Sequence, residues 1–130
     1  MGKQSNNTLR LQISTNDSSF VRDYIELLNG IFKLTNTEID ILVEMIAFDS
    51  KIPCSTESRK HVVDQLEFKN TAILNNYIRS LKNKGAIQEV RNRLYKYNNL
   101  IVPSKKLKQV VVQFNKNGVT ETTRVDASGV

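Results

Sequence analysis

The chain has 130 residues, 39% of them hydrophobic and 25% charged, a composition that predicts one globular domain and excludes wholesale disorder. Its formal net charge is +6, which suits an acidic partner better than a basic one. The single cysteine excludes an internal disulfide and fits a reducing compartment. Because the N-terminus is polar and no apolar run could cross a bilayer, we expect no signal peptide, no membrane contact and a cytoplasmic location, in a bacterial cell or an infected host cell.

Catalytic chemistry finds little support in the sequence. His61 is the only histidine and Cys54 the only thiol, so a metal site built from several such ligands is excluded and a Cys–His pair could only join these two residues. The glycine-rich sequences that cradle phosphates in nucleotide-binding enzymes are also missing. We therefore expect no enzyme activity, no catalytic residue, no metal and no cofactor.

The first predicted elements are a strand and a helix. Residues 8–14 alternate apolar and polar side chains, the pattern of a half-buried strand. From Phe20 to Phe32, two adjacent apolar rows cover about half of the helix circumference. Such a helix is buried on two sides or pairs with a copy of itself. We therefore expect a homodimer through residues 20–32 unless flanking strands cover this helix.

The next helix has the best-marked start in the chain. Thr35 and Glu38 fit a capping box, and Leu34 and Ile39 are spaced for the hydrophobic staple that often accompanies it. The helix runs to about Phe48 and carries apolar residues on both sides, which is typical of a central helix.

Two further helices and several strands complete the predicted fold. A loop over 49–54 leads to a short helix ending at Leu66, and a tight turn leads to a helix over 71–84 that Gly85 ends. Because strands 8–14 and 108–114 both lack an obvious partner, we expect them to pair. The alternating pattern predicts later strands over 86–90, 94–97 with an extension over 100–102, 108–114, and 119–125 after an Asn117-Gly118 turn.

The positive charge of the chain is concentrated in one stretch. Residues 69–108 contain ten Lys or Arg and a single acid, Glu89. A local positive field over a helix and a hairpin is the electrostatic footprint of a nucleic-acid binder. The alternative is a basic surface that serves only solubility.

Three helices followed by a two-stranded wing is an order that resembles the winged helix-turn-helix family. Residues 66–87 are the most specific part, and they are similar to the turn, recognition helix and first wing strand of bacterial and phage regulators. Residues 95–103 are similar to the strand that closes the wing in some plasmid and phage replication initiators. The resemblance implies an α+β fold in one domain (1–130), with a winged-helix core over 34–103, an N-terminal strand and helix over 8–33, and C-terminal strands and a tail over 104–130.

This resemblance implies sequence-specific binding of double-stranded DNA by a transcription or replication regulator, with helix 71–84 in the major groove. Asn75, Asn76 and Arg79 would contact base edges, because amide and guanidinium groups can form two hydrogen bonds with adenine and guanine. The helix start favours a phosphate, and Lys82, Lys84 and Lys96 would also face phosphates. Arg91 and Arg93 at the wing tip would lie on the flanking backbone or in the minor groove. The expected DNA-binding residues are Lys69, Asn70, Thr71, Asn75, Asn76, Arg79, Lys82, Arg91, Arg93 and Lys96.

A second interpretation stays open, because many winged helices bind proteins and the fold alone does not fix the function. Asn75 and Asn76 are also compatible with ordinary solvated helix residues, and Tyr95 and Tyr97 with packing of the wing. The alternative function is a phage virion, packaging or assembly protein that uses the fold as a protein-interaction block. A protein partner that orders the polar termini belongs to this alternative, and an acidic partner would exploit the same basic charges.

Overall fold

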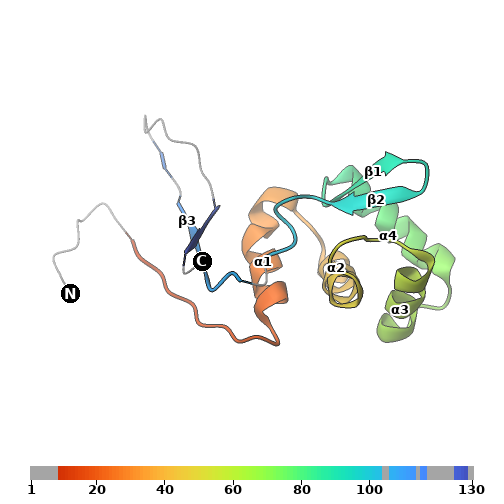
Figure 1. Cartoon of the computed structure of the whole chain (residues 1–130), viewed down its shortest axis with the longest axis horizontal. Helices are drawn as coiled ribbons and strands as arrows, with labels where there is room; N and C mark the ends of the chain where they lie inside the picture. Colours follow the sequence, from red (N-terminus) through yellow and green to blue (C-terminus); the bar gives the residue numbers. More distant parts are fainter. Residues whose placement is uncertain (1–8, 104–105, 114, 117–124, 129–130) are drawn as a thin grey trace.

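The computed structural model describes residues 9–103, 106–113, 115–116 and 125–128. Over these residues the chain is α+β, with four helices followed by four short strands (Figure 1). The four predicted helices are confirmed, and none of those described has the length and apolarity needed to span a membrane. The helices are α1 (Phe20–Phe32), α2 (Asn36–Phe48), α3 (Thr56–Leu66) and α4 (Thr71–Asn83), and the strands form two antiparallel pairs, β1 (Ile87–Arg91) with β2 (Leu94–Tyr97) and β3 (Gln109–Val112) with β4 (Val125–Ser128).

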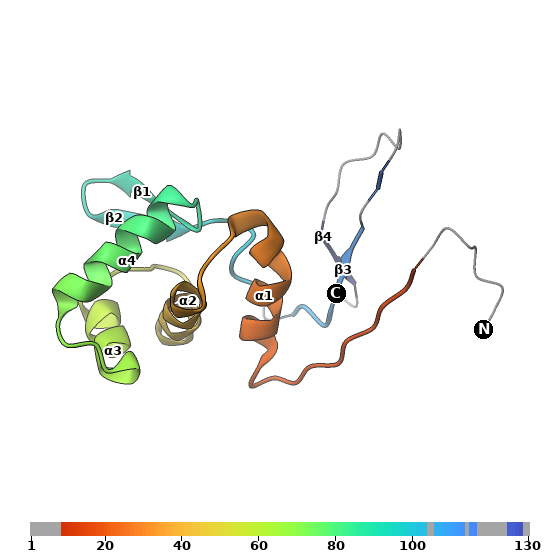
Figure 2. The ribbon, with the colours of Figure 1, turned by 180° about the vertical axis from the view of Figure 1, so that it is seen from behind.

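The central position predicted for α2 is confirmed. This helix lies between α1 on one side and α3 and α4 on the other (Figures 1 and 2). Ile41, Leu42 and Met45 of α2 are completely buried, and burial of each such side chain contributes about 1.5–3 kcal/mol. The core continues through Ile25 and Leu28 of α1, Val62 of α3, Leu74, Ile78 and Leu81 of α4, and Ile87 and Tyr97 of the β1–β2 hairpin.

The capping box predicted at the start of α2 is present. The Thr35 hydroxyl accepts a hydrogen bond from the backbone N–H of Glu38 (3.2 Å), and the Glu38 carboxylate accepts one from the backbone N–H of Thr35 (2.8 Å). Leu34 and Ile39 are both buried, as the hydrophobic staple requires. Because these contacts satisfy backbone donors that a helix leaves open, the start of α2 is fixed locally.

Gly85 ends α4, as predicted. Its φ of 87° lies in the left-handed region that favours glycine. Its N–H donates to the carbonyl of Lys82 (3.1 Å), and the N–H of Ala86 donates to the carbonyl of Leu81 (3.0 Å). These are the two hydrogen bonds of a Schellman motif, so a short, hydrogen-bonded connection joins α4 to β1.

The predicted extension of the second wing strand over residues 100–102 is wrong. β2 ends at Tyr97, and the chain then turns. Asn98 causes the difference, because its side chain donates to the carbonyl of Gly85 (3.0 Å) and accepts from the backbone N–H of Leu100 (2.9 Å). An asparagine that binds nearby backbone in this way competes with continuation of a strand.

The turn after β2 closes the core against α1. Ile101 is completely buried, and the Tyr24 hydroxyl of α1 donates a hydrogen bond to the carbonyl of Leu100 (2.7 Å). The segment after the wing is therefore part of the same folded unit as the first helix.

The predicted pairing of strand 8–14 with 108–114 is also wrong. Residue 8 lies outside the described residues, and residues 9–14 form no strand. Leu9, Leu11 and Ile13 are 81%, 77% and 80% exposed. Alternation alone predicted burial here, but alternation does not specify a partner.

β3 pairs instead with β4, in a register that runs from Gln109 opposite Ser128 to Val112 opposite Val125. A partner that follows in the sequence needs a shorter loop than the N-terminal segment would, and a shorter loop costs less entropy to close. The predicted Asn117-Gly118 turn and residues 119–124 lie outside the described residues. Leu107 and Val110 pack against the core, and β3 lies on the α1 side of the molecule (Figure 1).

Candidate nucleic-acid interface

One side of α4 is anchored in the core. Leu74, Ile78 and Leu81 are buried, as the spacing of apolar residues predicts. The side chain of Asn70 caps the helix by accepting a hydrogen bond from the backbone N–H of Ile73 (3.1 Å). The apolar stripe and the cap together decide which residues of α4 face outward.

A buried carboxylate ties the end of α4 to the start of α2. Glu38 is 2% exposed and accepts hydrogen bonds from Lys84 Nζ (2.6 Å) and from the Ser80 hydroxyl, besides its part in the capping box. Burial by itself raises the pKa of Glu38, but the hydrogen bonds from Lys84, Ser80 and the Thr35 backbone outweigh it and hold the pKa below its ordinary value. Lys84, expected at a phosphate from the sequence, is therefore engaged within the fold.

The opposite side of α4 is polar and basic. Asn76, Arg79 and Lys82 are exposed. Arg79 Nη1 donates to Asn76 Oδ1 at 3.3 Å, and Lys82 Nζ forms an ion pair with Glu89 of β1 at 3.2 Å. Exposed contacts of this kind contribute little, so a stronger partner could replace them.

Asn75 is half-buried because Arg59 of α3 binds it. Arg59 Nη1 donates to Asn75 Oδ1 (2.6 Å), and Arg59 Nε donates to the carbonyl of Cys54 (3.0 Å). The guanidinium carbon lies 6.0 Å from the ring centroid of Tyr95, at the limit of cation–π range. Sequence patterns do not single out Arg59, since it is one of several charged residues on a short helix and meets Asn75 only in the folded chain.

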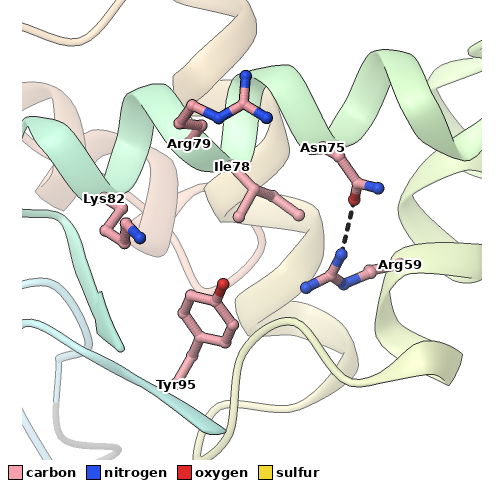
Figure 3. Close-up of a pocket in the computed structure, with 6 residues that line it drawn as sticks. All are labelled: Arg59, Asn75, Ile78, Arg79, Lys82 and Tyr95. Carbon is pink, nitrogen blue, oxygen red and sulfur yellow. Dashed lines mark hydrogen bonds between the residues drawn. The ribbon is translucent and has the colours of Figure 1, made fainter. Parts of the chain in front are cut away.

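A pocket of about 160 Å³ lies between α3, α4 and β2. In Figure 3, Arg59 of α3 and Tyr95 of β2 face the α4 residues across this space. Among the described residues, Glu89 is the only acid that forms an ion pair with a cation of the pocket, so the space suits an anion. The lining residues are Arg59, Asn75, Ile78, Arg79, Lys82 and Tyr95.

The β1–β2 hairpin presents the basic residues expected at the wing. Arg91, Arg93 and Lys96 are exposed. Arg93 adopts a φ of 63°, and its backbone N–H donates to the Glu89 carboxylate (3.2 Å). This bond, followed by the one from Lys82, lowers the pKa of Glu89. The hairpin tip is therefore held by a carboxylate while its cationic side chains remain exposed.

Of the ten residues expected to bind DNA, nine are exposed and Asn75 is half-buried. Lys69, Asn70 and Thr71 lie at the start of α4 and Lys82 near its end, which places them up to about 20 Å apart along the helix. Because α4 contacts β1, the wing lies beside this helix (Figure 1). The structure thus arranges the residues along one helix and its adjoining hairpin, and only Asn75, Arg79 and Lys82 meet at the pocket.

Two side chains near the pocket are internal. Burial raises the pKa of Cys54 to about 11, although the nearby Arg59 acts in the opposite direction, so this thiol stays protonated at neutral pH. Tyr97 is buried and donates its hydroxyl to the carbonyl of Asp49 (2.7 Å), which confirms that this tyrosine packs the wing. Over the part of the chain that the structure describes, no three His, Cys, Asp or Glu side chains are grouped to hold a metal ion.

Comparison of the chain with protein-family models, with curated proteins and with solved structures gives no match. No relative therefore assigns a role to α4, to the wing or to the pocket, and their geometry and charge are the observations that bear on function.

Proposed function

We propose that this chain is a winged-helix protein that binds double-stranded DNA sequence-specifically, as a transcription or replication regulator of bacterial or phage type. In this proposal, α2, α3 and α4 form the helix-turn-helix core, α4 enters the major groove, and β1 and β2 form the wing. The order of these elements and the contacts of α4 with α3 and β1 support it.

The observation that carries the proposal is the outward side of α4. It exposes an amide, a guanidinium and an ammonium group, on Asn76, Arg79 and Lys82, and α4 contains no acidic residue. An α-helix fits the major groove of B-DNA, where amide and guanidinium groups can each form two hydrogen bonds with a base edge. Because the core holds the other side of α4, these groups would reach DNA without a rearrangement of the helix.

The wing and the helix start would supply contacts that do not depend on sequence. Arg91, Arg93 and Lys96 are exposed on the hairpin next to α4, and Lys69 and Thr71 are exposed where α4 begins. Cationic side chains and the N–H groups of a helix start both favour phosphate oxygens. Such contacts would set the register of α4 on the duplex.

The test is duplex binding at several salt concentrations, measured by fluorescence anisotropy with random and selected oligonucleotides. A binder that neutralises phosphates must lose affinity steeply as salt rises, with a log–log slope of about −0.9 for each phosphate neutralised. A sequence-specific binder must also enrich a consensus from a random pool. If the anisotropy showed no binding to any duplex at low salt, the proposal would be ruled out.

A second candidate function, an assembly protein of phage virion or packaging type, is favoured by exposed apolar side chains. Leu27 and Ile31 of α1 are 48% and 60% exposed, and the N-terminal segment exposes Leu9, Leu11 and Ile13. Exposed apolar patches mark sites of contact with other proteins. A second copy of the chain docked on α1 is compatible with both functions.

Double substitution of Leu27 and Ile31 by glutamate separates the two candidates. If α1 supports a homodimer of a DNA-binding protein, light scattering should show a monomer and duplex affinity should fall without disappearing. If the chain is an assembly protein, capture of its partner should be lost while duplex retention is negligible for both the parent and the variant.

A further inference from the structure

We propose that the pocket between α3, α4 and β2 binds one phosphate group of a nucleic-acid backbone, with Arg59 as its main ligand. This inference rests on the proposed function and extends it. It adds a residue of α3, absent from the sequence-based set, to the contacts of α4 and the wing, and it gives the pocket a defined ligand.

Arg59 is held in place before any ligand arrives. A guanidinium has five N–H donors, and the bonds to the Cys54 carbonyl and to Asn75 use two of them, which leaves three for a ligand. No acid forms an ion pair with Arg59 among the described residues. A fixed guanidinium without an acidic partner loses little side-chain entropy when it binds a phosphate, and its planar donors match phosphate oxygens.

The contact with Arg59 also decides how Asn75 can act. Because a guanidinium only donates, the atom of Asn75 that faces it must be the carbonyl oxygen, and Figure 3 shows the amide nitrogen directed away from Arg59. Reading adenine would require that oxygen as an acceptor together with the nitrogen as a donor. With the oxygen engaged, Asn75 mainly offers N–H groups, which suit phosphate oxygens or the acceptors of guanine.

The remaining lining matches a phosphate in charge and size. Arg79 and Lys82 add two cations, and Tyr95 directs its hydroxyl toward α4 (Figure 3). A volume of about 160 Å³ leaves room for a phosphate group. The pocket also lies between α4 and the wing, where the backbone of a strand bound by both would pass.

The first experiment uses inorganic phosphate and the full chain. Sodium phosphate and sodium chloride at equal ionic strength are titrated into isotope-labelled protein, and the Arg59 Nε–H and Asn75 side-chain resonances are followed by NMR. We expect phosphate-specific shifts at both groups. The Asn75 shift should vanish in Arg59→Gln, and both shifts should persist in Lys60→Gln, which removes the same charge from the neighbouring exposed position of α3.

The second experiment measures duplex affinity for the same pair of variants. Arg59→Gln should bind about tenfold more weakly, the usual effect of losing one charged hydrogen-bonding group, and its salt slope should fall by about one. Lys60→Gln should match the parent. If Arg59→Gln does not keep the parent melting temperature, Arg59→Lys retains the charge but loses the planar donors, and a loss of affinity larger than that of Lys60→Gln is still expected.

The outcomes separate this inference from the proposed function. The phosphate pocket would be overturned if the Arg59 and Asn75 resonances did not respond to phosphate. It would also be overturned if Arg59→Gln and Lys60→Gln bound duplex with equal affinity, even if duplex binding is strong. Phosphate-specific shifts without any duplex binding would support the pocket and refute the DNA-binding proposal, and the phosphate would then belong to a free phosphorylated compound. If Arg59→Gln loses the phosphate shifts and duplex affinity while Lys60→Gln keeps them, the phosphate pocket and the DNA-binding proposal are both supported.

Discussion

α1 and α4 have the same length and both bury one apolar side, yet they present opposite outer surfaces. α1 leaves Leu27 and Ile31 exposed, whereas α4 exposes Asn76, Arg79 and Lys82. The two helices lie on different sides of α2 (Figure 2). The buried sides of α1 and α4 are therefore alike, and the two helices differ in the side chains that they expose.

Charge follows the same division. α1 carries Asp23 and Glu26 against the single cation Arg22, and α4 carries two cations, Arg79 and Lys82, and no acid. By this difference, α4 would attract a polyanion more strongly than α1 would. We infer that the α1 side suits an apolar partner such as a second copy of the chain, and that the α4 side suits nucleic acid.

The largest effect is expected from truncation inside the core. Leu81→Ala on α4 should lower the free energy of unfolding by about 2–5 kcal/mol, because Leu81 is completely buried and its truncation leaves a cavity. Ile31→Ala on α1 should change it by less than about 0.5 kcal/mol, because Ile31 is mostly exposed. Urea unfolding of both variants measures the difference. Equal destabilisation would mean that the outer side of α1 is covered.

Glu38→Gln should lower the free energy of unfolding by roughly 1–3 kcal/mol at neutral pH, since it removes a buried, hydrogen-bonded charge. The folded pKa of Glu38 lies below its unfolded value, so the stabilisation is present above the unfolded pKa and is lost as the pH falls through the folded pKa. The gap between parent and variant should therefore shrink in acid. Glu26→Gln, on the exposed surface of α1, is the control, and a gap that persists in acid would contradict the assignment.

Arg79→Ala should lower duplex affinity by roughly 1–3 kcal/mol and relax the sequence preference, as loss of a bidentate base contact does. Arg22→Ala removes the same charge from α1 and should leave both properties nearly unchanged. Anisotropy titrations together with selection from a random pool measure the two effects. If both variants lost affinity equally, long-range charge rather than a base contact would explain the role of Arg79.

The smallest effect per residue is expected at the wing. Combined Arg91→Ala and Arg93→Ala should weaken binding to all duplexes alike, by about 1 kcal/mol per residue or less, and should lower the salt slope by up to about two. The selected consensus should stay the same. A changed consensus would indicate that the wing reads bases in the minor groove.

Local signals in the sequence predicted much of this fold. Thr35 and Glu38 specify a helix start through backbone groups only a few residues away, and Gly85 specifies a helix end in the same way. The stripe that contains Leu81 needs only the helical repeat to be recognised as buried. Each of these features joins residues that are close together in the sequence, so both members of the contact can be recognised from the sequence.

The failed and missed predictions depend on contacts between distant residues. The alternation of Leu9, Leu11 and Ile13 predicted a buried strand, but burial needs a partner strand that the pattern does not name. Arg59 meets Asn75 only after α3 packs against α4. Glu38 was predicted as a cap, and its second contact, with Lys84, arises from tertiary structure.

The hydrogen bond from Tyr24 to the carbonyl of Leu100, together with the buried Ile101 beside it, bears on how the chain folds during its synthesis. α1 is synthesised before Leu100, its partner in this hydrogen bond, which lies 76 residues later in the chain. Until Ile101 has emerged, a nascent chain can form helices but cannot close its core. A translation product that ends at the wing would contain all four described helices but lack Ile101, so we expect it to be digested by proteases faster than the full chain.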